Sequence, residues 1–272
     1  MTRLAAAFAR GSGNGGPGNP DSRSPRARLV AYVTAGDPDL ARSRDVLRAV
    51  ARGGADVIEV GVPFSDPVAD GPVIQRASER ALAAGGTLAS SLELIHDARA
   101  DIAVPIVLFT YVNPVLRMGA RTFAARASEA GVDGVLLLDL PIEEAGDMHE
   151  ALDANGLDQI FLVSPTTSDD RIRAAARLGR GFLYAISRLG VTGARETVAT
   201  SAAPLVARIR AVTTIPIALG FGIATPAHVR EVMAYADAAI VGSALVGLIE
   251  ETAAAGRDVP AAVERFVAWL RS

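Results

Sequence analysis

Eight short apolar segments recur along the chain, and each is followed by a pattern typical of an amphipathic helix. Because the segments are apolar at nearly every position, they are typical of strands in a parallel sheet that is covered by helices. Several of the helical patterns begin near Asp, Ser or Thr and end near Gly, as helices commonly do. The segments are LVAYVTA (29–35), DVIEVGV (56–62), PIVLFTY (105–111), GVLLLDL (134–140), QIFLVSP (159–165), FLYAIS (182–187), PIALGFG (216–222) and AAIVGSA (238–244).

An unbroken series of eight strand–helix units predicts an α/β fold, the (β/α)8 or TIM barrel. The chain has 272 residues, close to the ~250 residues that such a barrel usually needs. A doubly wound open sheet is the alternative. That fold usually has fewer strands and a glycine-rich dinucleotide fingerprint after the first strand, and TAGDPD at 34–39 is not that fingerprint.

The first 28 residues precede the first predicted strand. MTRLAAAFAR, at the start, predicts a short amphipathic helix rather than a secretion signal. Residues 11–28 are rich in Gly, Pro and Ser, which predicts a linker. We therefore predict an extra N-terminal helix and linker over 1–28, and a single (β/α)8 catalytic domain over 29–272.

Two residue types are missing, and their absence excludes several kinds of chemistry. All 27 basic residues are arginines, so a lysine Schiff base, a PLP-linked lysine and a phosphate-loop lysine are excluded. The chain has no cysteine, which excludes disulfides and thiolate ligands. His96, His149 and His228 lie in helical patterns without metal-ligand spacing, so we expect no metal site.

The overall charge and hydropathy bear on partners and location. A net charge of −3 argues against nucleic acid or an anionic membrane as the main partner. No uninterrupted apolar run approaches the roughly 18 to 20 residues that span a bilayer. We expect a cytoplasmic protein with a small-molecule substrate.

Glu59 lies in the middle of the second apolar segment, where an unpaired carboxylate costs several kcal/mol to desolvate. By the two-residue period of strands it shares a face with Val57 and Gly61, which points either into the barrel mouth or at the helix layer. Active sites of these barrels lie at the carboxyl ends of the strands. Desolvation there raises a carboxyl pKa toward the range of a general acid or base. An ion pair with a nearby arginine is the alternative.

The loop after this strand, PFSDPVADGP, contains two aspartates. Asp66 precedes a proline and fits a turn or a helix cap. Asp70 taken alone is most simply part of an Asp-Gly turn, but beside Glu59 at a barrel mouth it is a candidate second acid–base group. Asp139, in LLLDLP, either reaches the mouth or holds a neighbouring loop.

Glycine-rich segments follow the last three predicted strands. They are GVTG (190–193), GFGI (220–223) and VGSALV (241–246). Phosphate sites in these barrels commonly use the loops after strands seven and eight and the start of a short helix. Glycines let backbone N–H groups approach an anion closely, and Ser243 adds a hydroxyl donor. The sequence therefore predicts a phosphorylated substrate.

Several motifs, in order from about residue 29 to the end, resemble the tryptophan synthase α subunit family. They are YVTAGDPD, EVGVPFSDPVADGPVIQ, LFTYVNP, ISRLGVTG, and GFGI followed by GSA. The resemblance implies a (β/α)8 barrel that splits indole-3-glycerol phosphate into indole and glyceraldehyde 3-phosphate. It also implies a PLP-dependent β subunit that receives indole through a tunnel in an α2β2 assembly, and no cofactor in this chain.

The resemblance also implies roles for individual residues. Glu59 would protonate indole C3 and take the proton of the glycerol hydroxyl, and Asp70 would hold the indole N–H and stabilise the positive charge. A retro-aldol cleavage without a Schiff base or a metal needs such an acid and base on one substrate. The implied substrate-binding residues are Tyr32, Tyr184, Thr192 and Phe221, and the phosphate-binding residues are Gly193, Gly222, Gly242 and Ser243. Thr192 lies on the loop after the sixth strand, where the family uses a threonine to close over Asp70.

Three features depart from the family pattern. Tyr32 stands where phenylalanine is common, and Ala224 stands where Ser or Thr is frequent. The insert at 11–28 leaves open whether the N-terminal helix docks under the barrel.

Three other functions fit parts of the sequence. A free-standing indole-3-glycerol phosphate lyase would use the same residues. A non-catalytic subunit that binds the ligand and activates a partner would not need both Glu59 and Asp70. A different phosphate-binding barrel, such as an isomerase, would not require the PFSDPVADGP loop.

Overall fold

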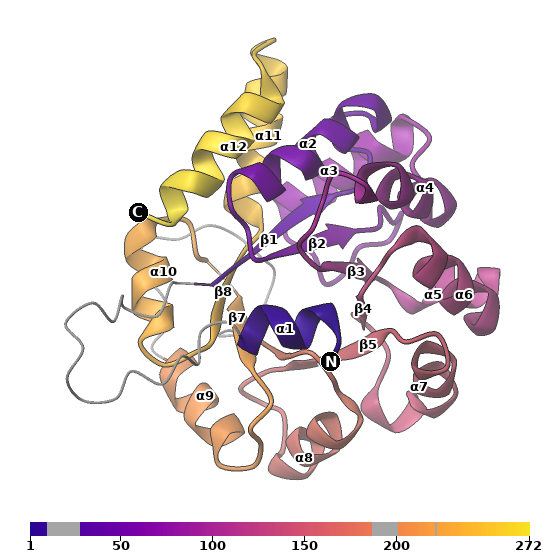
Figure 1. The fold of residues 1–272 in the computed structure, drawn as a ribbon, viewed down its shortest axis with the longest axis vertical. Helices are drawn as coiled ribbons and strands as arrows, with labels where there is room; N and C mark the ends of the chain where they lie inside the picture. The colour runs from indigo at the N-terminus through magenta and orange to yellow at the C-terminus, as the bar shows by residue number, and fades with distance from the viewer. Residues whose placement is uncertain (10–27, 187–200, 221) are drawn as a thin grey trace.

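The computed structural model describes residues 1–9, 28–186, 201–220 and 222–272. Within these residues, eight parallel strands close into a barrel in which each strand pairs with the next and β8 pairs with β1 (Figure 1). The strands are β1 (Leu29–Thr34), β2 (Val57–Gly61), β3 (Ile106–Thr110), β4 (Gly134–Leu137), β5 (Asp158–Val163), β6 (Leu183–Ile186), β7 (Ile217–Gly220) and β8 (Ala238–Val241). The TIM barrel prediction is confirmed, and the open-sheet alternative is excluded.

Helices surround the barrel and cover the outer faces of the strands (Figure 1). They are α1 (Arg3–Ala9), α2 (Leu40–Arg52), α3 (Pro72–Ala83), α4 (Leu88–Arg99), α5 (Val112–Met118), α6 (Ala120–Ala130), α7 (Gly146–Asp153), α8 (Asp169–Leu178), α9 (Ala202–Arg210), α10 (Pro226–Met233), α11 (Ser243–Ala254) and α12 (Val259–Leu270), with a short 3-10 helix, η1 (Ile142–Glu144). The expected polar caps are present: among the helices of the described ranges, five are preceded by a side chain that accepts a hydrogen bond from the first turn. These residues are Asp39, Thr87, Ser168, Thr225 and Asp258. No helix in the described ranges is long and apolar enough to cross a membrane.

The apolar strands contribute side chains to two separate cores, because successive side chains on a strand point to opposite faces. On β2, Ile58 and Val60 pack outward in the large cluster between the strands and the helices. Val57, the neighbour of Ile58, belongs to a second cluster that fills the barrel interior. Near-continuous burial of the strands therefore follows from having a core on each side, as their near-continuous apolar character predicted.

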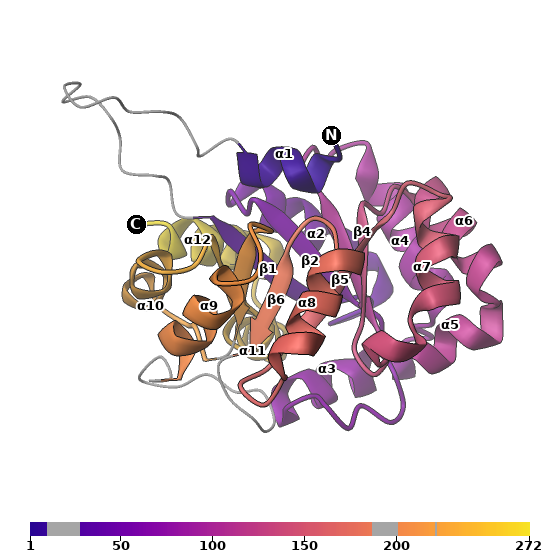
Figure 2. The same cartoon turned by 90° about the horizontal axis from the view of Figure 1, so that it is seen from below.

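Helix α1 closes the amino-terminal end of the barrel (Figures 1 and 2). Its two buried side chains, Leu4 and Phe8, belong to the interior cluster, and the Phe8 ring lies 5.4 Å from that of Phe182. Gly134, the first residue of β4, makes room for the Leu4 side chain, since a Cβ at Gly134 would lie 2.7 Å from Leu4 Cδ1. The Thr2 hydroxyl donates to Asp158 Oδ2 at 2.7 Å. The helix thus docks under the barrel despite the insert that follows it, and the domain boundary at residue 28 stays a prediction.

Candidate active site

Glu59 points into the barrel interior rather than at the helix layer. It follows the interior residue Val57 by two positions on β2, and it pairs in register with Tyr32 on β1 and Val107 on β3. Its side chain is fully buried, and neither carboxyl oxygen has a hydrogen-bond partner within the described part of the chain. The alternative of an arginine ion pair is not found among these residues.

The surroundings of Glu59 make it a strong candidate for an acid at neutral pH. Burial, with a smaller contribution from the nearby charge of Asp70, raises its pKa from an ordinary 4.5 to about 8. A carboxyl group in an apolar site holds its proton because ionisation there lacks solvation. Glu59 is therefore protonated at pH 7, when most exposed glutamates are ionised.

Asp70 lies at the end of the loop after β2, two residues before α3 begins, and only 7% of its surface is exposed. The Tyr111 hydroxyl donates a hydrogen bond to Asp70 Oδ2 at 3.0 Å, and the same hydroxyl accepts one from the Ala69 N–H at 3.1 Å. The Gln75 amide donates to the Asp70 carbonyl at 2.9 Å, which holds the loop against α3. The carboxylate is thus held in place beyond what an Asp-Gly turn requires.

The pKa of Asp70 is raised less than that of Glu59. Burial raises it and the hydrogen bond from Tyr111 partly offsets that rise, so the pKa moves from 3.8 to about 6. At pH 7 the site therefore contains an ionised Asp70 beside a protonated Glu59. Two carboxyl groups whose pKa values differ in this way commonly take different roles in catalysis.

Tyr111 is a site residue that the residue-by-residue reasoning missed. It directly follows β3, its side chain is buried, and its ring stacks on that of Phe64 with centroids 4.8 Å apart. Its position just past a strand end, within LFTYVNP, is the signal that identifies it, because side chains there reach the barrel mouth. Burial and the charge of Asp70 raise the pKa of Tyr111, which keeps its hydroxyl protonated as a donor.

Tyr32 and Tyr184 both stand on interior positions near Glu59. Burial raises the pKa of each phenol strongly, with Asp70 and Glu59 adding to the rise. Each ring extends over a glycine of the neighbouring strand. A Cβ at Gly61 would lie 2.0 Å from the Tyr32 hydroxyl oxygen, and one at Gly220 would lie 2.7 Å from that of Tyr184. Glycine at these two positions therefore leaves the space that the tyrosines occupy.

The predicted phosphate-binding segment begins where β8 ends. Gly242 precedes the twelve-residue helix α11, and Ser243 is its first residue. The first turn of an α-helix presents N–H groups that have no acceptor within the helix, which suits an anion. The side chain of Tyr32 lies beside Gly242, 3.5 Å from the place of a Cβ there, so this helix start adjoins the interior residues. Gly222 is the other predicted phosphate-binding residue within the described ranges. Its φ of +78° favours glycine.

The structure therefore brings Glu59, Asp70, Tyr32, Tyr184 and Gly242 to the carboxyl end of the barrel, and Ser243 follows directly. The predicted residues Thr192, Gly193 and Phe221 lie outside the described residues. Which of these residues bind the substrate stays a prediction.

The other aspartates considered from sequence have structural contacts. Asp66 accepts a hydrogen bond from the Ser65 hydroxyl at 2.6 Å, within the turn of its loop. Asp139 Oδ1 accepts from the Val112 N–H at 2.7 Å, so it holds the start of α5.

Ala224, which departs from the family pattern, makes a backbone contact: its N–H donates to His228 Nδ1 at 3.3 Å. Within the described ranges, no cluster of three or more His, Cys, Asp or Glu residues is arranged to hold a metal ion.

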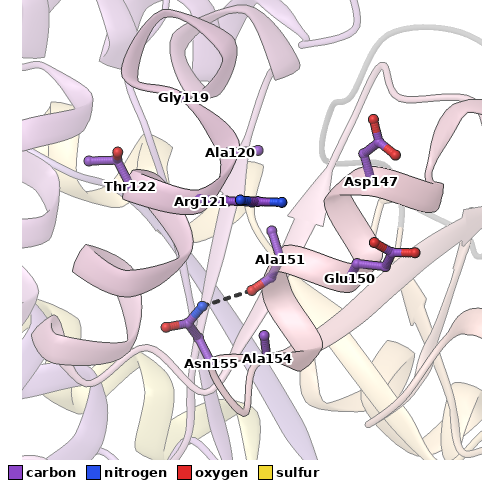
Figure 3. A pocket seen from close by; sticks show the side chains of 9 residues that line it. All are labelled: Gly119, Ala120, Arg121, Thr122, Asp147, Glu150, Ala151, Ala154 and Asn155. Carbon is purple, nitrogen blue, oxygen red and sulfur yellow. Dashed lines mark hydrogen bonds between the residues drawn. The ribbon is translucent and has the colours of Figure 1, made fainter.

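A separate groove lies between α6 and α7, outside the barrel (Figure 3). Its lining residues are Gly119, Ala120, Arg121, Thr122, Asp147, Glu150, Ala151, Ala154 and Asn155. The Asn155 amide, just after the end of α7, donates to the Ala151 carbonyl of that helix at 2.8 Å (Figure 3). None of the predicted site residues lines this groove, so the barrel mouth remains the candidate active site.

Known proteins that are similar to this chain show the family to which it belongs. A family model described as Tryptophan synthase alpha chain matches residues 20–270. The chain belongs to the tryptophan synthase alpha chain family. The alpha chain of Geobacter sulfurreducens is 50% identical over 273 residues, covering 100% of this chain and 98% of the relative. That of Solibacter usitatus is 52% identical over 231 residues, covering 85% of this chain and 86% of the relative.

Solved structures agree with the tryptophan synthase alpha chain assignment. A structure of Mycobacterium tuberculosis tryptophan synthase superposes with a TM-score of 0.88 at 36% identity, covering 100% of this chain and 97% of that one. The alpha chain of Legionella pneumophila gives a TM-score of 0.87 at 33% identity, covering 100% and 96%. As a tryptophan synthase alpha chain, the protein is a lyase of tryptophan biosynthesis that cleaves indole-3-glycerol phosphate. The isomerase, free-standing lyase and non-catalytic alternatives are not favoured.

Proposed function

We propose that Glu59 and Asp70 carry out the cleavage of indole-3-glycerol phosphate into indole and glyceraldehyde 3-phosphate, with Glu59 as acid and base. One observation carries the proposal. A fully buried carboxyl group with no partner among the described residues lies at the barrel mouth, beside a second carboxylate of lower pKa. A buried ionisable group without a partner is costly, and such groups concentrate at catalytic sites.

In the first step the protonated Glu59 transfers its proton to C3 of the indole ring. The ring becomes a cationic indolenine, and its positive charge is centred on the N–H. The ionised Asp70 accepts a hydrogen bond from that N–H and stabilises the cation electrostatically. Because Asp70 is buried, its charge acts in a medium of low dielectric, where it stabilises the developing cation more than it would in water.

In the second step the carbon–carbon bond breaks. Glu59, now a carboxylate, accepts the proton of the hydroxyl on the adjacent glycerol carbon. That carbon becomes the aldehyde of glyceraldehyde 3-phosphate, and the bonding electrons return to the ring to restore aromatic indole. Glu59 ends the cycle protonated, so no further acid, base or metal is required.

Substitution of the two carboxyl groups tests these roles. Glu59→Gln keeps the shape of the side chain but cannot transfer the proton, so we expect cleavage to be lost while binding of phosphate ligands is retained. Asp70→Asn should lower the rate severely. Comparable turnover in Glu59→Gln would overturn the acid–base role. A loss of less than about tenfold in Asp70→Asn, ~1.4 kcal/mol, would reduce Asp70 to a turn residue. Glu93→Gln, at an exposed position on α4, is the matched control and should leave turnover unchanged.

The proposal also covers the fate of indole. Alpha chains of this family pair with a β chain, and we propose that this chain passes indole to a PLP-dependent β subunit in a cytoplasmic α2β2 heterotetramer. Since the sequence has no lysine, PLP cannot form a Schiff base within this chain, which supports its placement in the partner. Exposed apolar side chains near the mouth, Val68 at 81% and Leu116 at 61% exposure, suit a docking surface there.

Indole release from indole-3-glycerol phosphate distinguishes the coupled enzyme from a free-standing one. It is measured with the purified chain alone and again with a β subunit added. Slow release that rises steeply with the β subunit supports the coupled assembly. Fast release that ignores the β subunit would refute the coupling while leaving the roles of Glu59 and Asp70 untouched.

A further inference from the structure

Four charged side chains form a continuous series of ion pairs between α3 and α11. Arg76 makes two bonds to Glu250, with Nε–Oε1 and Nη2–Oε2 distances of 2.8 and 2.7 Å. Arg80 Nη1 donates to the same Glu250 at 2.8 Å. The other side of the Arg80 guanidinium makes two bonds to Asp37, at 2.8 and 3.1 Å. Arg80 thus joins α3 to α11 and to the loop after β1.

The ion pairs of Arg80 are more buried than an ordinary pair on the protein surface. Asp37 is only 1% exposed, and the side chains of Arg80 and Glu250 are 29% and 26% exposed. A planar guanidinium that is engaged on two edges has one favoured orientation, which a flexible ammonium would not provide. The neighbouring Gly36 N–H donates to the Ser43 hydroxyl at 2.9 Å, which anchors the loop that carries Asp37.

An apolar layer lies beneath the ion pairs and joins the same two helices to the site. Ile74 and Ala77 of α3 pack with Val246 of α11 and with the ring of Tyr32 in one buried cluster. The two helices run side by side in the same direction, since Val73 lies near Gly247 while Arg76 bonds Glu250. A shift of one helix along the other would therefore disturb both layers.

Each helix begins at one end of the substrate site. Helix α3 starts two residues after Asp70, and its Gln75 side chain holds the Asp70 carbonyl. Helix α11 starts at Ser243, in the predicted phosphate-binding segment. The relative position of α3 and α11 therefore sets the distance between the group that holds the indole N–H and the group that holds the phosphate.

We propose that Arg80 is a positioning residue that holds the indole-binding end and the phosphate-binding end of the site at the spacing of the intact substrate. This inference rests on the proposed function of Asp70 and on the predicted phosphate-binding role of Ser243. Arg80 contacts neither end directly and acts through Glu250 and Asp37. Its effect should therefore be felt by a ligand that spans both ends and not by a fragment that occupies one.

Comparison of the whole substrate with a fragment tests the inference. In Arg80→Met and Glu250→Gln, we expect kcat/KM for indole-3-glycerol phosphate to fall by about 10- to 100-fold, because misplacement of a reacting group by ~1 Å costs about that much. The inhibition constant of inorganic phosphate, a fragment that needs only one end, should stay within about twofold of the parent value. Arg80→Lys, which keeps the charge without the fork, should recover part of the loss.

Arg52→Met is the matched control. It breaks the Arg52–Glu264 pair of 2.8 Å, which joins two other neighbouring helices, α2 and α12, and it should leave both constants unchanged. The inference is overturned if kcat/KM in the folded Arg80 and Glu250 variants stays within about threefold of the parent. It is also overturned if the phosphate inhibition constant rises in parallel, since that marks a general loosening. Arg80→Met leaves Asp37 unpaired. If that variant does not fold for this reason alone, Glu250→Gln and Arg80→Lys decide the outcome. Failure of the proposed function would show separately, as activity retained in Glu59→Gln or in Asp70→Asn.

Discussion

Replacing Glu59 by Gln tests the electrostatics of the site through stability, independently of any assay of turnover. In the folded chain the Glu59 carboxyl group is fully buried and its pKa is about 8, whereas its ordinary value is 4.5. The unfolded chain therefore releases this proton at a lower pH than the folded chain does. Because its folded pKa is raised, Glu59 lowers the free energy of unfolding progressively as the pH rises from about 4.5 to about 8.

The size of the effect follows from the two pKa values. Each unit of difference corresponds to about 1.4 kcal/mol. At pH 7 the folded chain keeps the proton that the unfolded chain has lost, so Glu59 costs about 3 kcal/mol of stability, rising to about 5 kcal/mol at pH 9 and falling to about 1 kcal/mol at pH 5. Glu59→Gln has no proton to lose. Its free energy of unfolding should therefore exceed that of the parent by a margin that grows by ~4 kcal/mol between pH 5 and pH 9.

Urea unfolding at pH 5, 7 and 9, followed by far-ultraviolet circular dichroism, measures this margin. The change with pH is the decisive quantity, because the cost of burying the Gln amide itself does not vary with pH. Glu93→Gln, at an exposed site, should differ from the parent by less than about 0.5 kcal/mol at each pH. A margin for Glu59→Gln that is the same at all three pH values would refute the account of Glu59 as a desolvated, unpaired acid.

Three further outcomes are expected. The pH profile of kcat/KM should be bell-shaped, rising as Asp70 ionises near pH 6 and falling as Glu59 ionises near pH 8; activity that is flat over this range would contradict the assignment. Tyr111→Phe removes a hydrogen bond that lowers the pKa of Asp70, so the acid limb of that profile should move to higher pH; a limb that does not move would remove Tyr111 from the site. Leu4→Ala should cost about 2 to 5 kcal/mol in urea unfolding with KM unchanged, since Leu4 is fully buried at the opposite end of the barrel; a raised KM would contradict that separation.

Much of the fold could be predicted from local pattern. Seven of the eight predicted apolar segments contain one observed strand, and the fifth misses only the first residue of its strand, because burial on both faces leaves a continuous apolar signal that needs no knowledge of the partners. The caps at Asp39 and Ser168 were equally local, since a capping side chain bonds a backbone group only a few residues away. The docking of α1 was not local. Leu4 and Phe8 meet β4 and the start of β6, more than a hundred residues later, and only the closed barrel brings them together.

The candidate site also has some residues that the local sequence reveals and others that only the fold reveals. Glu59 was identified because a carboxylate inside an apolar strand is conspicuous wherever it lies, and Asp70 followed from the loop that comes next. Tyr111 gave a weaker signal, its position just past a strand end, and many tyrosines at such positions only pack. Its role depends on a hydrogen bond across forty-one positions of the chain, to Asp70.

By itself, the sequence determined the strand–helix series, the side-chain types available for chemistry and the two carboxyl groups, because these depend on neighbours in the chain. Only the tertiary structure decided which way Glu59 faces, that it lacks a partner among the described residues, and that α3 and α11 are joined through Arg80. The physical reason is that burial and charge interactions are properties of the surroundings in space. A carboxyl group acquires its raised pKa from strands and loops that come together only when the barrel closes.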